Sequence, residues 1–258
     1  MAEEFKNKIK RLELENFTCF SKAVFDFSPG INIIIGENGT GKTHLLKVLY
    51  AILFQSHQSI KEGSHQQGGF GYELTKKLIN VLRTDRIHNL VRKEVEGNLN
   101  FIVLSFGNED QTFGFGKPPA SPITGSDANF WTGQPKSFTV KNLPLFIPVI
   151  EFLSIYEGFI HQYKIREVAF DETYNDLAVS LEGNPLKNSA LLEAKKLSKE
   201  LEDVLGGEVY KKNGKFFIKY TSNEIEVETS LNAQGLNKIA QLIYLIQNGS
   251  LTKDTILF

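Results

Sequence analysis

The chain has 258 residues, of which 41% are hydrophobic and 23% charged, and its formal net charge is −1. This length suits one large domain or two small ones, and the composition excludes a disordered chain. The near-zero net charge argues against a protein that binds nucleic acid along a whole face, although a neutral total leaves room for a local basic patch.

The single cysteine, Cys19, excludes an internal disulfide and any multi-cysteine metal site. It lies in a strand-like run between Phe17 and Phe20, which predicts an inert, buried or half-buried thiol. The charged N-terminus lacks the apolar core of a signal peptide. No apolar run approaches the length of about 20 residues that crosses a bilayer. The sequence therefore predicts a cytoplasmic protein.

The first elements alternate apolar and polar residues. Ile9–Phe17 and Phe20–Phe27 have the pattern of two half-buried strands that pair across a short turn. Ile31–Ile35 is continuously apolar, which predicts a strand buried on both faces, as in a parallel sheet. His44–Phe54 has leucines and an isoleucine at helical spacing, and the Ser-, His-, Gln- and Gly-rich stretch Gln55–Gly71 indicates a loop.

The middle of the chain indicates a helix over Tyr72–Leu82 and a strand over Asn98–Phe106. Glycine and proline breakers predict a loop over Gly107–Gly133. Helical patterns dominate from Glu151 to Leu205, with an interruption near Gly183-Asn184-Pro185.

After Gly206-Gly207 the pattern changes to strands. Glu208–Lys212 and Lys215–Tyr220 flank Asn213-Gly214, the strongest short-range signal for a β-hairpin. The remaining predicted elements are a third strand, a helix and a final apolar run: Ile225–Thr229, Leu236–Ile246 and Thr255–Phe258.

Residues 36–43 read Gly-Glu-Asn-Gly-Thr-Gly-Lys-Thr and fit the pattern G-x-x-x-x-G-K-[ST]. Gly36 and Gly41 let the backbone turn so that N–H groups point at phosphate oxygens. Lys42 supplies positive charge to the β- and γ-phosphates, and the Thr43 hydroxyl suits Mg²⁺. Both residues open the predicted helix, whose positive dipole end faces the anion.

The alternative is a glycine-rich turn that binds nothing. The motif, however, lies between a buried-strand pattern and an amphipathic helix, the context that phosphate binding requires. We therefore expect ATP and Mg²⁺ as cofactors, with Thr43 as the metal ligand. The predicted nucleotide-binding residues are Gly36, Glu37, Asn38, Gly39, Thr40, Gly41, Lys42, Thr43 and His44.

Three segments resemble the ATPase heads of the Rad50, SMC, RecF and OLD type, which are relatives of ABC transporter ATPases and count among the AAA family ATPases (AAA-15-like). These segments are Leu14-Glu15-Asn16-Phe17, Gly30-Ile31-Asn32 and Gly36–Leu46. Later segments are similar to the same group: Phe146-Ile147-Pro148 with Glu151, Asp171–Ala178 and Ala233–Ala240.

The resemblance implies an α/β P-loop NTPase fold of the ABC-ATPase-like kind over 1–258. In it, 1–55 form the β-subdomain and P-loop unit, 56–205 a mostly helical lobe with loops, and 206–258 a hairpin, a signature-like helix and the start of the Walker B strand. The resemblance also implies a signature loop that opens a helix and caps the γ-phosphate on the opposite subunit. Asn232-Ala233-Gln234-Gly235-Leu236 matches its place, so Ala233, Gln234 and Gly235 are its candidates. An ordinary helix start is the alternative, and Lys238 either adds positive charge or is solvated.

Other family positions are not identified. The glutamine that links the lobes has four candidates: Gln55, Gln66, Gln67 and Gln111. Glu151 is a candidate near the nucleotide, although a solvated glutamate at a helix start is the simpler interpretation. The chain stops at Phe258, where the family's Asp-Glu pair begins, so the catalytic residues are unknown and we expect this chain to bind ATP but barely hydrolyse it. Asp171-Glu172 is the nearest alternative pair of acids.

The resemblance implies an ATP-binding domain that, in the intact protein, hydrolyses ATP in a nucleotide-dependent homodimer coupled to a nuclease or DNA-handling partner; some similar proteins belong to anti-phage systems. The alternative is a non-hydrolysing, nucleotide-gated regulatory or assembly module. A GTPase or small-molecule kinase is less favoured because no Asn-Lys-x-Asp motif is present.

Overall fold

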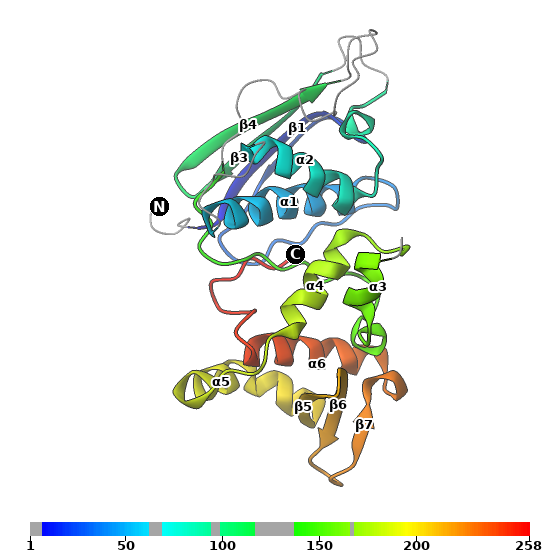
Figure 1. The fold of residues 1–258 in the computed structure, drawn as a ribbon. Coiled ribbons are helices and arrows are strands. Elements are labelled where there is room, and N and C mark those ends of the chain that lie inside the picture. Colours follow the sequence, from blue (N-terminus) through cyan, green and yellow to red (C-terminus); the bar gives the residue numbers. More distant parts are fainter. Residues whose placement is uncertain (1–6, 62–68, 94–98, 117–136, 166–167) are drawn as a thin grey trace. The chain divides into compact units, whose positions relative to one another are not determined.

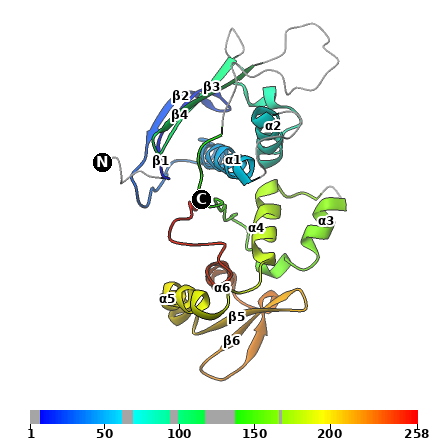
Figure 2. The same cartoon turned by 60° about the vertical axis from the view of Figure 1, so that its left-hand side comes forward.

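The computed structural model describes residues 7–61, 69–93, 99–116, 137–165 and 168–258. The chain forms two compact units, Met1–Pro144 and Leu145–Phe258, drawn in two orientations in Figures 1 and 2. Each unit combines an antiparallel sheet with helices. Within the described ranges, no helix is both long enough and apolar enough to cross a membrane.

The sheet of the first unit has four strands in the order β2-β1-β3-β4, all antiparallel. Its strands are β1 (Ile9–Phe17), β2 (Phe20–Asp26), β3 (Leu99–Phe106) and β4 (Glu109–Gly116). The alternating pattern of β1 places Leu12 opposite Leu104 and Leu14 opposite Ile102, and all four side chains are fully buried. The predicted strands at 9–17, 20–27 and 98–106 are therefore confirmed.

The helices of the first unit are α1 (Lys42–Lys61) and α2 (Gly69–Leu82), followed by the short 3-10 helix η1 (Ile87–Leu90). Helix α1 buries Leu45, Val48, Leu49, Ile52 and Leu53, and α2 buries Leu74, Leu78 and Val81. Lys77 of α2 is also buried, with its ammonium 3.6 Å from the centre of the Phe54 ring of α1. A cation over an aromatic face joins the two helices.

Two loop predictions in this unit are wrong. Helix α1 continues to Lys61 and α2 begins at Gly69, so 55–61 and 69–71 of the predicted loop at 55–71 are helical. The rest of that loop, 62–68 with the candidate glutamines at 66 and 67, lies outside the described ranges. Strand β4 occupies the start of the loop predicted at 107–133, and 117–133 lie outside the described ranges. Pairing with β3 along its length, Ile102 opposite Phe113, outweighs the weak strand propensity of its glycines.

Ile31–Ile35 does not form the buried strand that its apolar run predicts. Ile31, Ile33 and Ile35 are 82–89% exposed, and no described strand pairs with them. An apolar run becomes a strand only when a neighbouring strand satisfies its backbone hydrogen bonds.

The second unit contains a three-stranded sheet in the order β5-β6-β7. Its elements are η3 (Leu153–Ile155), α3 (Phe159–Ile165), α4 (Glu172–Glu182), α5 (Asn188–Leu205), β5 (Gly207–Lys212), β6 (Lys215–Tyr220), β7 (Glu226–Glu228), η4 (Thr229–Leu231) and α6 (Gln234–Gln247). Positive φ at Asn213 (51°) and Gly214 (77°) matches the type I′ turn that this dipeptide predicts. The hairpin, third strand and last helix are confirmed.

Aromatic rings dominate the core of the second unit. The ring of Phe216 packs edge-to-face against Tyr244 and Tyr156, with both centroid separations at 4.9 Å. At the ends of this unit, the backbone N–H of Leu145 donates to Ile256 and that of Phe258 donates back to Leu145, a short parallel pairing. The predicted apolar run at 255–258 is thus held beside the start of the unit.

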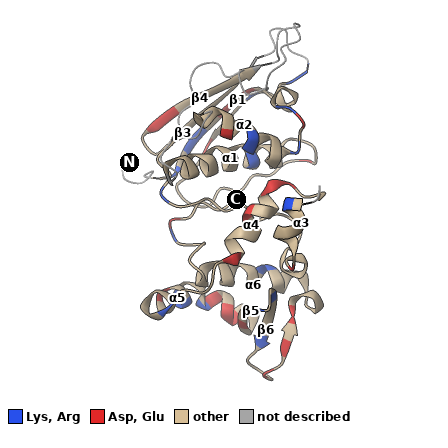
Figure 3. Cartoon of the chain, in the orientation of Figure 1, with Lys and Arg blue, Asp and Glu red and all other residues tan. Residues whose placement is uncertain are grey.

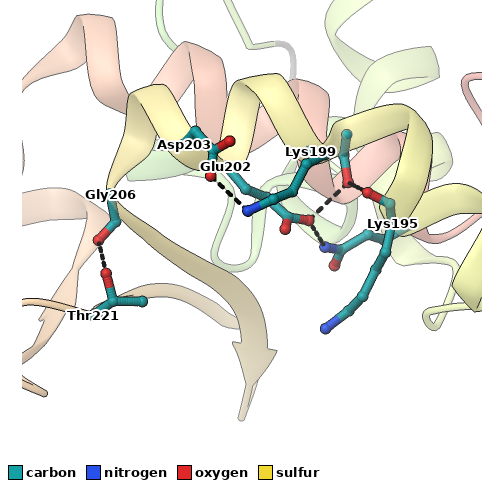
Figure 4. Close-up of polar contacts among 8 residues, drawn as sticks. Lys195, Lys199, Glu202, Asp203, Gly206 and Thr221 are labelled. Carbon is teal, nitrogen blue, oxygen red and sulfur yellow. Dashed lines mark hydrogen bonds and ion pairs between the residues drawn. The ribbon is translucent and has the colours of Figure 1, made fainter.

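A small polar network joins α5 to α6. The Ser198 hydroxyl and the Gln247 amide both donate to Glu202 Oε1, at 2.7 and 3.0 Å, and both donors are buried. Next to Glu202 on α5, Asp203 pairs with Lys199 at 2.6 Å, and both of these side chains are more than 60% exposed. Figure 4 shows the two adjacent acids making separate contacts. Because they are buried, the hydrogen bonds to Glu202 should stabilise the fold more than the exposed Asp203–Lys199 ion pair does.

We predict that Glu202→Ala destabilises the protein far more than Asp203→Ala. Loss of Glu202 leaves the buried Ser198 hydroxyl and Gln247 amide without this acceptor, which costs about 1–3 kcal/mol. Loss of the exposed Asp203 pair should cost little, because solvent screens it. Urea unfolding of both variants measures the difference, and equal losses would contradict the assigned role of the network.

Candidate nucleotide-binding site

The segment Gly36–Thr43 leads from the exposed residues 31–35 into α1. Gly39 (φ 82°) and Gly41 (φ 90°) adopt the left-handed backbone region that favours glycine. The Thr40 hydroxyl donates to the Glu37 carbonyl at 2.9 Å and closes the loop on itself. A Cβ atom built on Gly39 would meet nothing within 4 Å, so a ligand can approach the loop on this side.

The positive charge of the loop is the Lys42 ammonium. Its Nζ donates to the carbonyl oxygens of Gly36 at 2.7 Å and Glu37 at 2.5 Å. The Lys42 side chain therefore folds back over the preceding loop, and its ammonium lies beside the loop backbone. Phosphate oxygens are acceptors of the same kind as these carbonyls and would compete for the same three N–H donors.

The first turn of α1 adds a second source of positive potential. Its first intrahelical bond runs from Leu45 N–H to the Gly41 carbonyl at 2.9 Å, and its first turn has no acidic residue. The N–H groups ahead of Leu45 therefore have no partner within the helix, and the helix dipole favours an anion there. Thr43 is exposed, so its hydroxyl is accessible to a metal ion.

His44 differs in character from the rest of the predicted set. Burial, and then the nearby charge of Lys47, lowers the pKa of the His44 imidazole. The ring is therefore neutral at neutral pH and adds no charge to the loop. A neutral imidazole can bind a nucleotide through a hydrogen bond or ring packing but not through charge, and a role for His44 stays a prediction.

The loop offers a Mg²⁺ ion a side-chain oxygen, the Thr43 hydroxyl, and would rely on a nucleotide for others. Among the described residues, no group of three His, Cys, Asp or Glu side chains could hold a metal. Mg²⁺ usually binds through one or two protein oxygens together with substrate phosphates. The Thr43 hydroxyl supplies one such oxygen, and the phosphates of a bound nucleotide would supply others.

The signature-like segment lies at the start of α6 in the second unit. Ala233 precedes the helix and has no capping side chain, and the first turn has no acidic residue. Ala233, Gln234 and Gly235 are all exposed. The structure therefore presents an open helix N-terminus here, which is the physical requirement for binding an anion.

Two asparagines, one buried and one half-buried, hold the turn before this helix. Asn237 is 1% exposed, and its Nδ2 donates to the Thr229 carbonyl at 2.7 Å. Asn232 donates to the Asn237 amide oxygen at 3.3 Å and accepts from the Tyr220 hydroxyl at 2.9 Å. The turn is thus tied to both η4 and β6.

Two polar residues have structural partners that the sequence did not indicate. Lys238 is half-buried, and its Nζ donates to the Val149 carbonyl at 2.6 Å. Glu151 is not a solvated helix-start residue: it is 6% exposed and accepts hydrogen bonds from the Leu153 N–H and from both the N–H and hydroxyl of Ser154. Glu151 therefore caps η3.

The remaining candidates lie on separate elements of the two units. Asp171 caps α4 by accepting from the Thr173 N–H at 3.0 Å, and Glu172 lies in the first turn of that helix. Gln55 lies on α1 and Gln111 on β4. None of these placements identifies a catalytic residue.

The sequence predicted the short turn between β1 and β2, but not its contact with the motif, because the two segments lie far apart in the sequence. Cys19 in this turn is exposed, contrary to the prediction of a buried or half-buried thiol, since a two-residue turn projects its side chains away from the sheet. Both Cys19 and Phe20 lie against Gly41.

A family model described as "AAA ATPase domain" matches residues 8–256. Among curated proteins, the chain is similar to the DNA replication and repair protein RecF of Listeria monocytogenes, at 25% identity over 67% of this chain and 51% of that protein. It is also similar to RecF of Limosilactobacillus fermentum, at 38% identity over 23% of this chain and 17% of that protein. The chain spans at most about half the length of these relatives.

Solved structures show only weak similarity. A structure titled as the recombination mediator protein RecF with ATP matches 96% of this chain and 83% of its own, with a TM-score of 0.41 and 12% identity. A structure from work on ATP-driven dimerization of SMC ATPases matches 42% of this chain and 61% of its own, with a TM-score of 0.27 and 21% identity.

We predict that Asn237→Ala destabilises the turn before α6. The change removes a buried amide that bonds to Thr229 and Asn232, at a cost of about 1–3 kcal/mol. Asn223→Ala is the matched control, since Asn223 is exposed and accepts one bond from the Ile225 N–H. Urea unfolding compares the two, and a control loss as large as that of Asn237→Ala would contradict the prediction.

Proposed function

The chain belongs to the AAA ATPase domain family (AAA_15), and we propose that it is a nucleotide-binding head that holds Mg-ATP through Gly36–Thr43. Its family and its RecF relatives make it an ABC-like ATPase of the Rad50, SMC and RecF type, with an α/β P-loop fold. Nucleotide binding at these residues is the proposal.

One observation carries the proposal. The Lys42 ammonium lies 2.7 Å or less from two carbonyl oxygens of the loop. Lys42 is also the first residue of α1, whose first turn has no acidic residue. The loop therefore combines a point charge, unpaired backbone N–H groups and exposed glycines in one place. Triphosphate is a polyanion whose oxygens match each of these donors. The Thr43 hydroxyl would help to hold Mg²⁺, which would supply positive charge to offset that of the phosphates.

We extend the proposal to a nucleotide-dependent homodimer. The Gly36–Thr43 loop and the α6 N-terminus belong to different units of one chain, and each is open to an anion. In the proposed dimer, the residues Ala233, Gln234 and Gly235 of one copy cap the γ-phosphate bound to the other. On α5, lysines lie among glutamates and an aspartate (Figure 3), and this mixed charge does not by itself favour nucleic acid.

In the whole protein, the proposed activity is ATP hydrolysis in the cytoplasm, coupled to a nuclease or DNA-handling partner. The similar protein of Listeria monocytogenes is the DNA replication and repair protein RecF, and this supports a DNA-handling partner. The second candidate is a non-hydrolysing module in which nucleotide only gates assembly. The capping roles of Glu151 and Asp171 favour the non-hydrolysing module, because both carboxylates accept hydrogen bonds that stabilise the fold.

We predict that Lys42→Ala lowers ATP affinity by about 10–100-fold, the factor for losing a hydrogen bond to a charged group worth about 1.5–3 kcal/mol. Lys22→Ala is the control, because Lys22 is an exposed lysine of β2 in the same unit and its loss should leave the affinity unchanged. Titration calorimetry with ATP and Mg²⁺ measures the ATP affinity of wild type, Lys42→Ala and Lys22→Ala. Equal affinities for wild type and Lys42→Ala would exclude this loop as the binding site.

We further predict that Gly235→Asp abolishes nucleotide-dependent dimerisation and leaves ATP binding by the monomer intact. A Cβ atom at Gly235 would meet nothing within 4 Å, and an acid is favourable in a first helical turn, so the fold tolerates the change. The added charge repels a γ-phosphate presented by the other copy. Gly235→Ala, which adds no charge, is the control.

Light scattering with and without a non-hydrolysable ATP analogue gives the readout for these variants. Wild type and Gly235→Ala should dimerise only with the analogue. A Gly235→Asp protein that still dimerises with the analogue, or a wild-type dimer without it, would contradict the proposed arrangement.

A further inference from the structure

Gly41 is packed against the turn that joins β1 to β2. A Cβ atom built on Gly41 would lie 2.6 and 2.9 Å from two ring atoms of Phe20 and closer still to Cys19 Sγ. Ordinary Cβ contacts are longer than 3.0 Å. The side chains of the turn therefore occupy the space where any other residue at position 41 would carry its side chain.

A segment 70 residues further along the chain holds this turn in place. The Thr18 N–H donates to the Leu90 carbonyl at 2.7 Å, and the Arg92 N–H donates to the Asn16 carbonyl at 2.8 Å. Arg92 also donates from Nη1 to the Cys19 carbonyl at 2.6 Å. The turn is thus bonded on both sides of its tip, and the Arg92 guanidinium binds the backbone of the residue that touches Gly41.

The position of Gly41 determines the start of α1. Its carbonyl accepts the first helical bond, from the Leu45 N–H, and the next two residues are Lys42 and Thr43. A shift of Gly41 would therefore move both the ammonium and the hydroxyl that the proposed function assigns to the triphosphate and Mg²⁺. Contact with Cys19 and Phe20 limits such a shift on one side of the loop.

The contact adds little to the core. The buried residues of β1 are Leu12, Leu14 and Phe17, whereas Cys19 is exposed and Phe20 only half-buried, with its ring edge-to-face against Phe25 at 5.9 Å. Packing of the sheet therefore does not require Cys19 or Phe20 to lie against the loop.

From this geometry we propose that the β1–β2 turn is a positioning element of the nucleotide site. Phe20 and Cys19, held by Arg92, set the backbone of Gly41 so that Lys42 and Thr43 reach the phosphates. Phe20 and Arg92 are positioning residues, since they act through Gly41. This inference rests on the proposed binding of ATP at Gly36–Thr43.

The first experiment uses the fact that Cys19 is the only cysteine in the chain. N-ethylmaleimide attached to Cys19 adds bulk against Gly41 and should lower ATP affinity by about tenfold or more, equivalent to about 1.4 kcal/mol. Cys19→Ser treated with the same reagent is the control and should bind ATP as untreated wild type does. Mass spectrometry verifies complete labelling, and calorimetry with ATP and Mg²⁺ measures affinity.

The second experiment uses substitutions that do not depend on the thiol. Phe20→Ala and Arg92→Ala should each weaken ATP binding about fivefold or more, since fivefold is about 1 kcal/mol, while the urea midpoint stays near that of wild type. Phe20→Leu and Arg92→Lys should recover most of the affinity. Arg11→Ala is the control, because Arg11 lies in the same sheet and pairs with Glu13 and Asp26.

The outcomes separate the two proposals. Undiminished affinity in fully labelled wild type, or in Phe20→Ala and Arg92→Ala, would overturn the positioning role while ATP binding itself stands. Losses as large in Arg11→Ala as in Phe20→Ala would also overturn it, because any change to the sheet would then suffice. Wild type that fails to bind ATP would overturn the proposed function and this inference with it.

Discussion

The proposed nucleotide site depends on the backbone of one glycine. Gly41 adopts a φ of 90°, a region that residues with a Cβ rarely occupy, and it does so where Phe20 leaves no room for a side chain. The two requirements are independent, since one is torsional and the other steric. Together they explain why the start of α1, and with it the directions of Lys42 and Thr43, can be held by a turn from another part of the sheet.

At the second candidate anion site, the start of α6, the backbone before the helix is held by different interactions. The start of α6 has no glycine with a positive φ. Its turn is held instead by side-chain amides, with Asn237 bonded to Thr229 and Asn232. Lys238 anchors the first turn of the helix to the Val149 carbonyl. Buried amides and a lysine fix the turn from inside, and Ala233, Gln234 and Gly235 remain exposed.

Several charged residues that could suggest catalysis serve the fold. Glu151 caps η3 and Asp171 caps α4, while Lys211 donates to the Leu181 and Glu182 carbonyls at the end of α4, both at 3.0 Å. Each of these contacts satisfies backbone groups that a short helix leaves unpaired. A carboxylate that is needed for such bonds is less available as a general base. Among the described residues, nucleotide binding is therefore better supported than a catalytic role for Glu151 or Asp171.

The sequence by itself determined the local features of this protein. Alternation over Ile9–Phe17, the Asn213-Gly214 turn and the pattern of Gly36–Thr43 each depend on neighbours in the chain, so their strand, hairpin and loop-to-helix structures could be predicted. The family assignment, too, follows from segments that are readable in order along the sequence.

Only the tertiary structure decided features that depend on distant partners. Pairing with β3 made a strand of Glu109–Gly116 despite its glycines, and Ile31–Ile35 remained exposed because no described strand pairs with it. The burial of Glu151 and the contact of Phe20 with Gly41 likewise require residues to meet in space. Periodicity and propensity describe one stretch of chain at a time, whereas packing and hydrogen bonding select which stretches meet.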